Sequence, residues 1–64
     1  MTKQLQNMIQ KVSTLTANNE LKEWENFEFI KHLQIEMNQF LSDQQWIKAF
    51  DNAYIIIHMI ENKQ

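Results

Sequence analysis

The sequence predicts an all-α protein with three helices, at about residues 2–17, 20–41 and 43–61. Two observations predict this class. The 64 residues include no Gly and no Pro, which tight turns and strand ends usually require and which helix interiors exclude. The apolar residues recur at intervals of three and four, the spacing of one helix face. We therefore expect one helical domain over residues 1–64, with the second and third helices in an antiparallel hairpin.

The first segment, residues 2–17, has one apolar face. Its apolar residues follow one another at spacings of three, four and three, so they share one side of a helix. They are Leu5, Met8, Val12 and Leu15. The pair Asn18 and Asn19 then interrupts the pattern, and either residue can end this helix or cap the next one. We expect a turn there.

The second segment, residues 20–41, opens with glutamates that complement the dipole of a helix start. At about 100° per residue, one wide apolar face carries Phe29, Ile30, Leu33, Met37, Phe40 and Leu41. A second apolar group falls roughly opposite or on the shoulder of that face. It comprises Leu21, Trp24, Phe27 and Ile35. A helix of this kind is either sandwiched between neighbours or presents a second contact surface.

The third segment, residues 43–61, is expected to begin with a capping box in which Ser42 caps the helix and Gln45 reaches back to the Ser42 amide. Its main stripe repeats at spacings of four and three. The stripe comprises Trp46, Phe50, Ala53, Ile57 and Ile60, with Ile47 and Tyr54 beside it. A second apolar strip behind it comprises Ile55, Ile56 and Met59. The connection from the second segment is only one or two residues long, which favours a hairpin.

Chain length and cysteine content predict self-association. A core built from 64 residues supplies only about 3 to 5 kcal/mol, so such chains usually need disulfides, a metal or a second copy. The absence of Cys excludes disulfides. We therefore expect a homodimeric helical bundle. The absence of Arg, together with many Lys, Asn, Gln and Ile residues, also suggests AT-rich codons and an origin in a low-GC bacterium, a phage or a plasmid.

Nothing in the residue pattern indicates catalysis or a cofactor. There is no Cys nucleophile, no Gly-rich phosphate loop and no Ser with an evident His and acid. His32 and Glu36 are four residues apart, as two metal ligands on a helix would be, with His58 distant in the sequence. A zinc site normally needs three or four ligands, so the spacing is more typical of a solvated pair. We expect no enzyme activity, no cofactor and no metal.

The apolar surplus predicts a protein partner. All seven aromatic residues lie beyond residue 20, and a three-helix monomer cannot bury both apolar sides of its last two helices. Exposed apolar patches usually mark interaction sites. We assign partner binding to Leu21, Trp24, Phe27 and Ile35, and self-association to Ile55, Ile56 and Met59. The predicted function is that of a non-enzymatic regulator, encoded by a phage or mobile element, that inhibits or modulates another protein.

An acidic surface supports an alternative function. Glu20, Glu23, Glu25 and Glu28 help to make residues 20–43 net negative by four. Such a cluster can mimic DNA phosphates and inhibit a DNA-binding protein, although it is also typical of a solvated helix start. Direct nucleic-acid binding is not expected, because six Lys spread through the chain and no Arg do not form a basic face.

Membrane association gives the remaining alternative. The longest apolar run, residues 53–57, is far short of the ~20 residues that span a bilayer, and residues 1–17 do not form a signal peptide. We expect a cytoplasmic protein. A further alternative is a peripheral membrane protein, or a bacteriocin-immunity-like helical protein, that uses its basic N-terminal helix with Lys3 and Lys11. Two Lys attract anionic lipid only weakly.

Overall fold

The computed structural model describes residues 2–63. Within them the chain forms three α-helices and one short 3₁₀ helix, with no strand. The elements are α1 (Lys3–Thr16), η1 (Asn19–Glu23), α2 (Phe27–Ser42) and α3 (Trp46–Glu61). The predicted all-α class with three main helices is confirmed.

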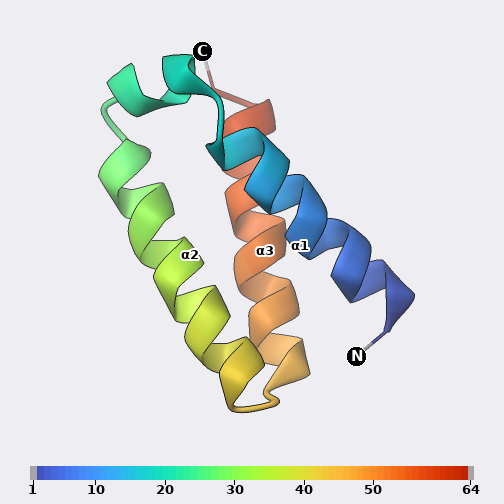
Figure 1. Ribbon diagram of the computed structural model, residues 1–64. Helices are drawn as coiled ribbons and strands as arrows, with labels where there is room; N and C mark the ends of the chain where they lie inside the picture. Colours follow the sequence, from blue (N-terminus) through green and yellow to red (C-terminus); the bar gives the residue numbers. More distant parts are fainter. Residues whose placement is uncertain (1, 64) are drawn as a thin grey trace.

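The helices form a hairpin with a third helix across it. Helices α2 and α3 run antiparallel and pack closely, and α1 lies over one side of the hairpin, mainly against α3 (Figure 1). The predicted hairpin of the second and third helices is thus confirmed. Toward its N-terminus α1 diverges from the hairpin (Figure 1). Because both α1 and α2 pack mainly against α3, α3 is the central helix, with neighbours on two sides.

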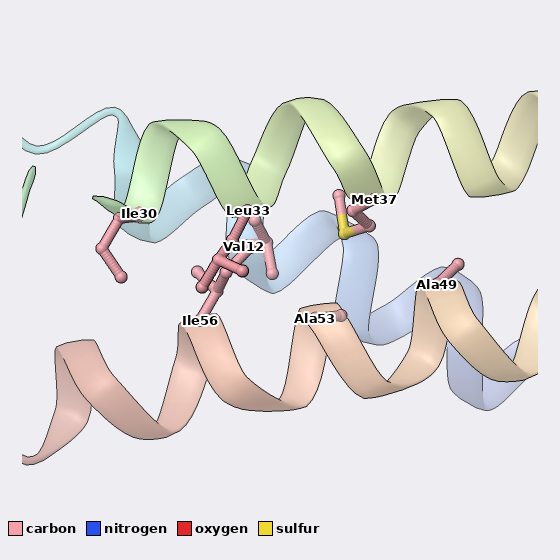
Figure 2. Close-up of a cluster of buried hydrophobic side chains, with 7 residues drawn as sticks. All are labelled: Val12, Ile30, Leu33, Met37, Ala49, Ala53 and Ile56. Carbon is pink, nitrogen blue, oxygen red and sulfur yellow. The ribbon is translucent and has the colours of Figure 1, made fainter. Parts of the chain in front are cut away.

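The core lies where the three helices meet (Figure 2). Its main cluster comprises Val12 of α1, Ile30, Leu33 and Met37 of α2, and Ala49, Ala53 and Ile56 of α3. On both helices of the hairpin the buried positions are spaced by three and four residues, as a helix with one buried side requires. Burial of one large aliphatic side chain contributes about 1.5–3 kcal/mol. This cluster therefore holds the three helices together.

Helix α1 follows its prediction closely. It begins and ends within one residue of the expected bounds. The Thr2 hydroxyl accepts a hydrogen bond of 3.2 Å from the Leu5 amide and so caps the first turn. Leu5 and Val12, two members of the predicted apolar face, are buried.

The expectation that α2 begins at residue 20 is wrong. The Asn18 side chain caps η1 by accepting a 2.9 Å hydrogen bond from the Glu20 amide. Trp24 then has extended backbone, and α2 starts only at Phe27. A continuous helix would hold Leu21 opposite the core face, whereas the break turns it inward to an exposed fraction of 1%. That burial offsets the helical hydrogen bonds lost at the break.

The predicted capping box at Ser42 is also wrong. Ser42 is the last residue of α2, and the Gln45 side chain makes no capping hydrogen bond. Instead the Gln45 amide donates to the Phe40 carbonyl at 2.8 Å and the Gln44 amide to the Leu41 carbonyl at 3.1 Å. Gln44 has a φ of 59°. This is the Schellman arrangement, in which the residue after the helix adopts the left-handed conformation.

The buried side of α3 is rotated relative to its prediction. Only Ala53 of the expected stripe is fully buried, whereas Ala49 and Ile56 are fully buried beside it. The reason is that α3 has two neighbours. The predicted stripe faces α1 through Phe50, whereas α2 lies on a different side of α3, so the residues between the two directions are covered most completely.

Candidate functional site

An apolar cleft lies between the N-terminal end of α1 and the first turn of α3. It has a volume of about 260 Å³. Its lining comprises Thr2, Leu5, Trp46, Ile47 and Phe50. Leu5 is buried, Trp46 is 37% exposed and Ile47 is 79% exposed. We call this the Trp46 cleft, and we call the end of the bundle that holds it the open end.

Two local features create the cleft. The three-residue Schellman turn starts α3 abruptly at Trp46, so nothing from the preceding chain covers the first turn of that helix. On the other side, α1 diverges from the hairpin as it approaches its N-terminus (Figure 1). Leu5 still reaches α3 and is buried, but the space in front of Trp46 and Ile47 stays open to solvent.

A second hollow adjoins the same two residues. It has a volume of about 340 Å³ and is lined by residues 44–48. Trp46 and Ile47 line both hollows. The Lys48 ammonium lies 5.6 Å from the centre of the Phe40 ring and so adds a cation to the polar side of this region. Trp46 and Ile47 are therefore the shared apolar feature of the open end.

The lining of the Trp46 cleft is mainly apolar. Among the described residues its lining carries two polar groups, the Thr2 hydroxyl, which caps α1, and the indole N–H of Trp46. Acid–base and nucleophilic catalysis need titratable or activated groups in the pocket. The chemistry that the lining provides is burial of apolar surface against two aromatic and two aliphatic side chains.

The predicted partner-binding residues do not form one exposed surface. Leu21 is buried, so its assignment to an exposed face is corrected. Trp24 is half-buried against the core, with the Lys63 ammonium 6.0 Å from its ring. Phe27 is half-buried with Lys31 over its ring. Ile35 is exposed on the outer side of α2, eight residues further along, which is about 12 Å.

The predicted self-association strip is split in the same way. Ile56 is fully buried in the core, so it is not available to a second copy. Ile55 remains 43% exposed, and Met59 is partly buried. The physical reason is the rotated buried side of α3, which takes in Ile56 and leaves its neighbour Ile55 outside.

The four glutamates of the predicted acidic surface are all exposed. Glu20 and Glu23 belong to η1, Glu25 lies in the following turn and Glu28 in the first turn of α2. They therefore lie along one continuous stretch at the opposite end of the bundle from the cleft (Figure 1). Mimicry of DNA by this surface stays a prediction.

The histidines do not gather into a metal site. His32 Nε2 lies 3.9 Å from Glu36 Oε1, with both side chains largely exposed. His58 stacks on Tyr54, with ring centres 6.0 Å apart, and its ring contacts Asn62. Within residues 2–63 no group of three or more His, Asp or Glu side chains is placed to hold a metal ion.

The described helices also bear on the membrane alternatives. None of the helices between residues 2 and 63 combines the length and the apolarity that crossing a bilayer requires. Of the two lysines proposed for lipid contact, Lys11 forms an ion pair of 2.9 Å with Glu61 of α3. Lipid contact through α1 stays a prediction. Of Lys3 and Lys11, the two cations proposed for it, Lys11 is already paired with Glu61.

Comparisons of the chain with protein-family models, with curated proteins and with solved structures found no match. Sequence reasoning missed the Trp46 cleft because Trp46 was placed in the core stripe and Ile47 beside it. The position of Trp46 and Ile47 could have indicated their exposure. A residue in the first turn of a helix that follows a very short connection has no preceding chain to cover it.

Proposed function

We propose that the protein is a non-enzymatic regulator that binds another protein through the Trp46 cleft. The observation that carries the proposal is the exposure of Ile47 and Trp46 beside a cavity floored by the buried Leu5. Tryptophan is among the residues most enriched in the energetic centres of protein interfaces. An apolar side chain from a partner helix, inserted into this cleft, would remove Ile47 and Trp46 from water.

A protein partner fits the cleft better than a small molecule does. Pockets for small ligands usually measure about 300–1,000 Å³ and combine apolar walls with several convergent polar groups. This cleft is smaller, at about 260 Å³, and the polar groups of its described lining are only the Thr2 hydroxyl, which caps α1, and the indole N–H of Trp46. It exceeds the roughly 150 Å³ cavity that accepts benzene. One aromatic or large aliphatic side chain is therefore a suitable occupant.

Self-association is the second part of the proposal. A chain of 64 residues with a small core gains stability when a second copy covers its remaining apolar surface. Exposed Ile55 and half-buried Met59 support this. They lie on a different side of α3 from Ile47, so a dimer leaves the Trp46 cleft open. Inhibition of the partner, and an origin in a phage or mobile element, remain predictions from the sequence.

Site-specific photocrosslinking tests the partner site. A benzoylphenylalanine is placed at position 47 in the cleft or at position 35, an exposed apolar position outside it. Each protein is irradiated in a lysate of the source cells. We expect discrete adducts from position 47 and few from position 35, because a reactive ketone in the cleft is held against the partner.

Competition distinguishes specific adducts from random ones. Excess wild-type protein should suppress the adduct at position 47, whereas excess Ile47→Glu protein should not, because a buried charge is costly in an apolar site. Equal adducts from both positions, or equal competition, would overturn the proposal. Adducts lost in roughly 0.5 M salt would favour the acidic surface instead, since salt screens charge contacts over a few ångströms.

A further inference from the structure

The side of the hairpin opposite α1 is an apolar face without a covering element among residues 2–63. Phe50 lines the cleft together with Leu5 of α1, so Phe50 faces α1. Lys48 and Ile55 lie about 160° and 140° round the helix from Phe50 and so face away from α1. Figure 2 shows the same arrangement, with α1 passing behind the two helices of the hairpin.

We call this side the back face. Phe40 of α2 lies on it because it contacts Lys48, and Glu36 and Phe29, four and eleven residues before Phe40, share that side of α2. Helix α3 contributes Lys48, Asn52, Ile55 and Met59. Two contacts join the helices along it. Lys48 lies over the Phe40 ring at 5.6 Å, and the Asn52 amide donates to the Leu33 carbonyl at 3.2 Å. Phe29 is 52% exposed and Ile55 43% exposed, which leaves a substantial apolar area in contact with water.

The area of the back face matches a small, self-complementary interface. A helix of 16 residues is about 24 Å long, and paired helices lie about 10 Å apart. Two helices, each about 10 Å across, make the face about 20 Å wide, so each copy presents roughly 500 Å² and two copies together bury about 1,000 Å². That total is at the lower limit for a specific interface. A second copy has a face of the same length and width and therefore covers the whole back face. Because the buried area is small, we expect the dimer to be weak.

Charge selects the symmetry of that dimer. The back face carries one acid on α2 and one base on α3. Phe40 and Lys48 are at the same height, so Glu36, four residues from Phe40, lies about 6 Å along the axis from Lys48. A two-fold axis parallel to the helices keeps heights unchanged and places α2 on α3 of the second copy. Each Glu36 then comes within reach of the opposite Lys48. An axis in the plane of the face and perpendicular to the helices instead places α2 on α2, and when the two faces overlap fully it brings the two Glu36, which lie near the middle of α2, close together.

We infer that two copies of this chain dock through their back faces about a two-fold axis parallel to α2 and α3, with Glu36 of each copy paired with Lys48 of the other. The inference rests on the proposed self-association. The same symmetry brings Phe29 near the height of Met59 of the second copy, where a sulfur–aromatic contact is favourable. The two hairpins then form a four-helix bundle, with α1 of each copy on the outside and the Trp46 clefts open to solvent.

A charge-swap series measured by sedimentation equilibrium tests this pairing. The proteins are the wild type, Glu36→Lys, Lys48→Glu and the double variant. The wild type should show a concentration-dependent dimer. Each single variant should weaken dimerisation at least tenfold, because the symmetry places two like-charge pairs in the interface. The double variant restores both pairs in reversed order and should return to within threefold of the wild type. Glu28→Lys, a charge reversal elsewhere on α2, should change dimerisation less than twofold.

The possible outcomes distinguish the docking geometry from the proposed self-association. A wild-type protein that stays monomeric overturns both the self-association and the docking geometry. A dimer that tolerates either single variant, or a double variant no better than the singles, overturns the Glu36–Lys48 geometry and leaves self-association standing. Circular dichroism on dilute, monomeric samples shows whether the helices persist. Unchanged helicity there assigns any loss of dimer to the interface.

Discussion

Trp24 and Trp46 lie at opposite ends of the same bundle and have opposite environments. Trp24 belongs to the end closed by η1, here called the closed end, where it packs against the core under Lys63. Trp46 belongs to the open end, where it lines a cleft beside the exposed Ile47. Both are tryptophans near the start of a helix in an apolar pattern. The difference lies in the connecting chain that precedes each of them.

The lengths of the two connections explain the contrast. The residues between α1 and α2 are numerous enough to form a capped 3₁₀ turn that folds over the end of the bundle and buries Leu21. The connection between α2 and α3 is a three-residue turn, which reverses the chain but covers nothing. An apolar residue at a helix end is therefore buried only when a neighbouring segment is long enough to cover it.

The largest expected effect is at the closed end. Leu21→Ala should lower the free energy of unfolding by about 2 to 4 kcal/mol, the usual cost of emptying a well-packed leucine site. Ile47→Ala at the open end should change it by less than about 0.5 kcal/mol, because its side chain is in water. Urea unfolding in the presence of a stabilising osmolyte measures both variants. Equal losses would show that the two ends do not differ.

A smaller effect of opposite sign is expected in the turn at the open end. Gln44 adopts a φ of 59°, a conformation that costs a non-glycine residue roughly 1–2 kcal/mol. Gln44→Gly should therefore raise the free energy of unfolding by about 0.5–1 kcal/mol. Gln39→Gly, inside α2, should lower it by about 1 kcal/mol. Thermal unfolding compares the two variants. A loss in both would contradict the left-handed conformation at Gln44.

The smallest expected effect concerns the ion pair near the closed end. Lys11 Nζ and Glu61 Oε2 are 2.9 Å apart, with both side chains about half exposed. Solvent and salt screen such pairs, which contribute about 0–1 kcal/mol. Glu61→Gln should lower the free energy of unfolding by less than about 0.5 kcal/mol at low salt and by less at high salt. A loss well above 1 kcal/mol would mean that this charge pair, and not apolar burial, fastens α1 to α3.

Much of the fold was predictable because helical periodicity is a local property. The bounds of α1 were recovered within one residue, since Thr2 caps it in the ordinary way. The start of α2 was not, because the apolar pattern continues through residues 20–26 while the backbone does not. Whether Leu21 faces the core depends on the helices around it. The turn at Gln44 was missed because glycine or asparagine usually marks such positions.

The candidate site was less predictable than the fold. The sequence identified an excess of apolar residues and assigned the exposed share to two groups, of which Leu21 and Ile56 are buried whereas Ile35 and Ile55 are exposed. Exposure is decided by which sides of a helix its neighbours cover, and α3 has neighbours on two sides. The exposed share also includes Ile47 at the open end and Phe29 on the back face, which the sequence pattern places in or beside the core-facing stripes. Ile55 was assigned correctly to the exposed side of α3.

The two buried alanines of α3 limit how this sequence can vary. Ala49 and Ala53 have no exposed surface and sit where α3 meets its neighbours (Figure 2). Added methylene groups in a close-packed interior cost about 1–3 kcal/mol, which approaches the whole stability expected of so small a core. The smallest side chains of the core are thus among its least replaceable. Substitutions that are compatible with this fold therefore fall on the outer sides of the helices, where they alter the exposed surface and leave the packed bundle intact.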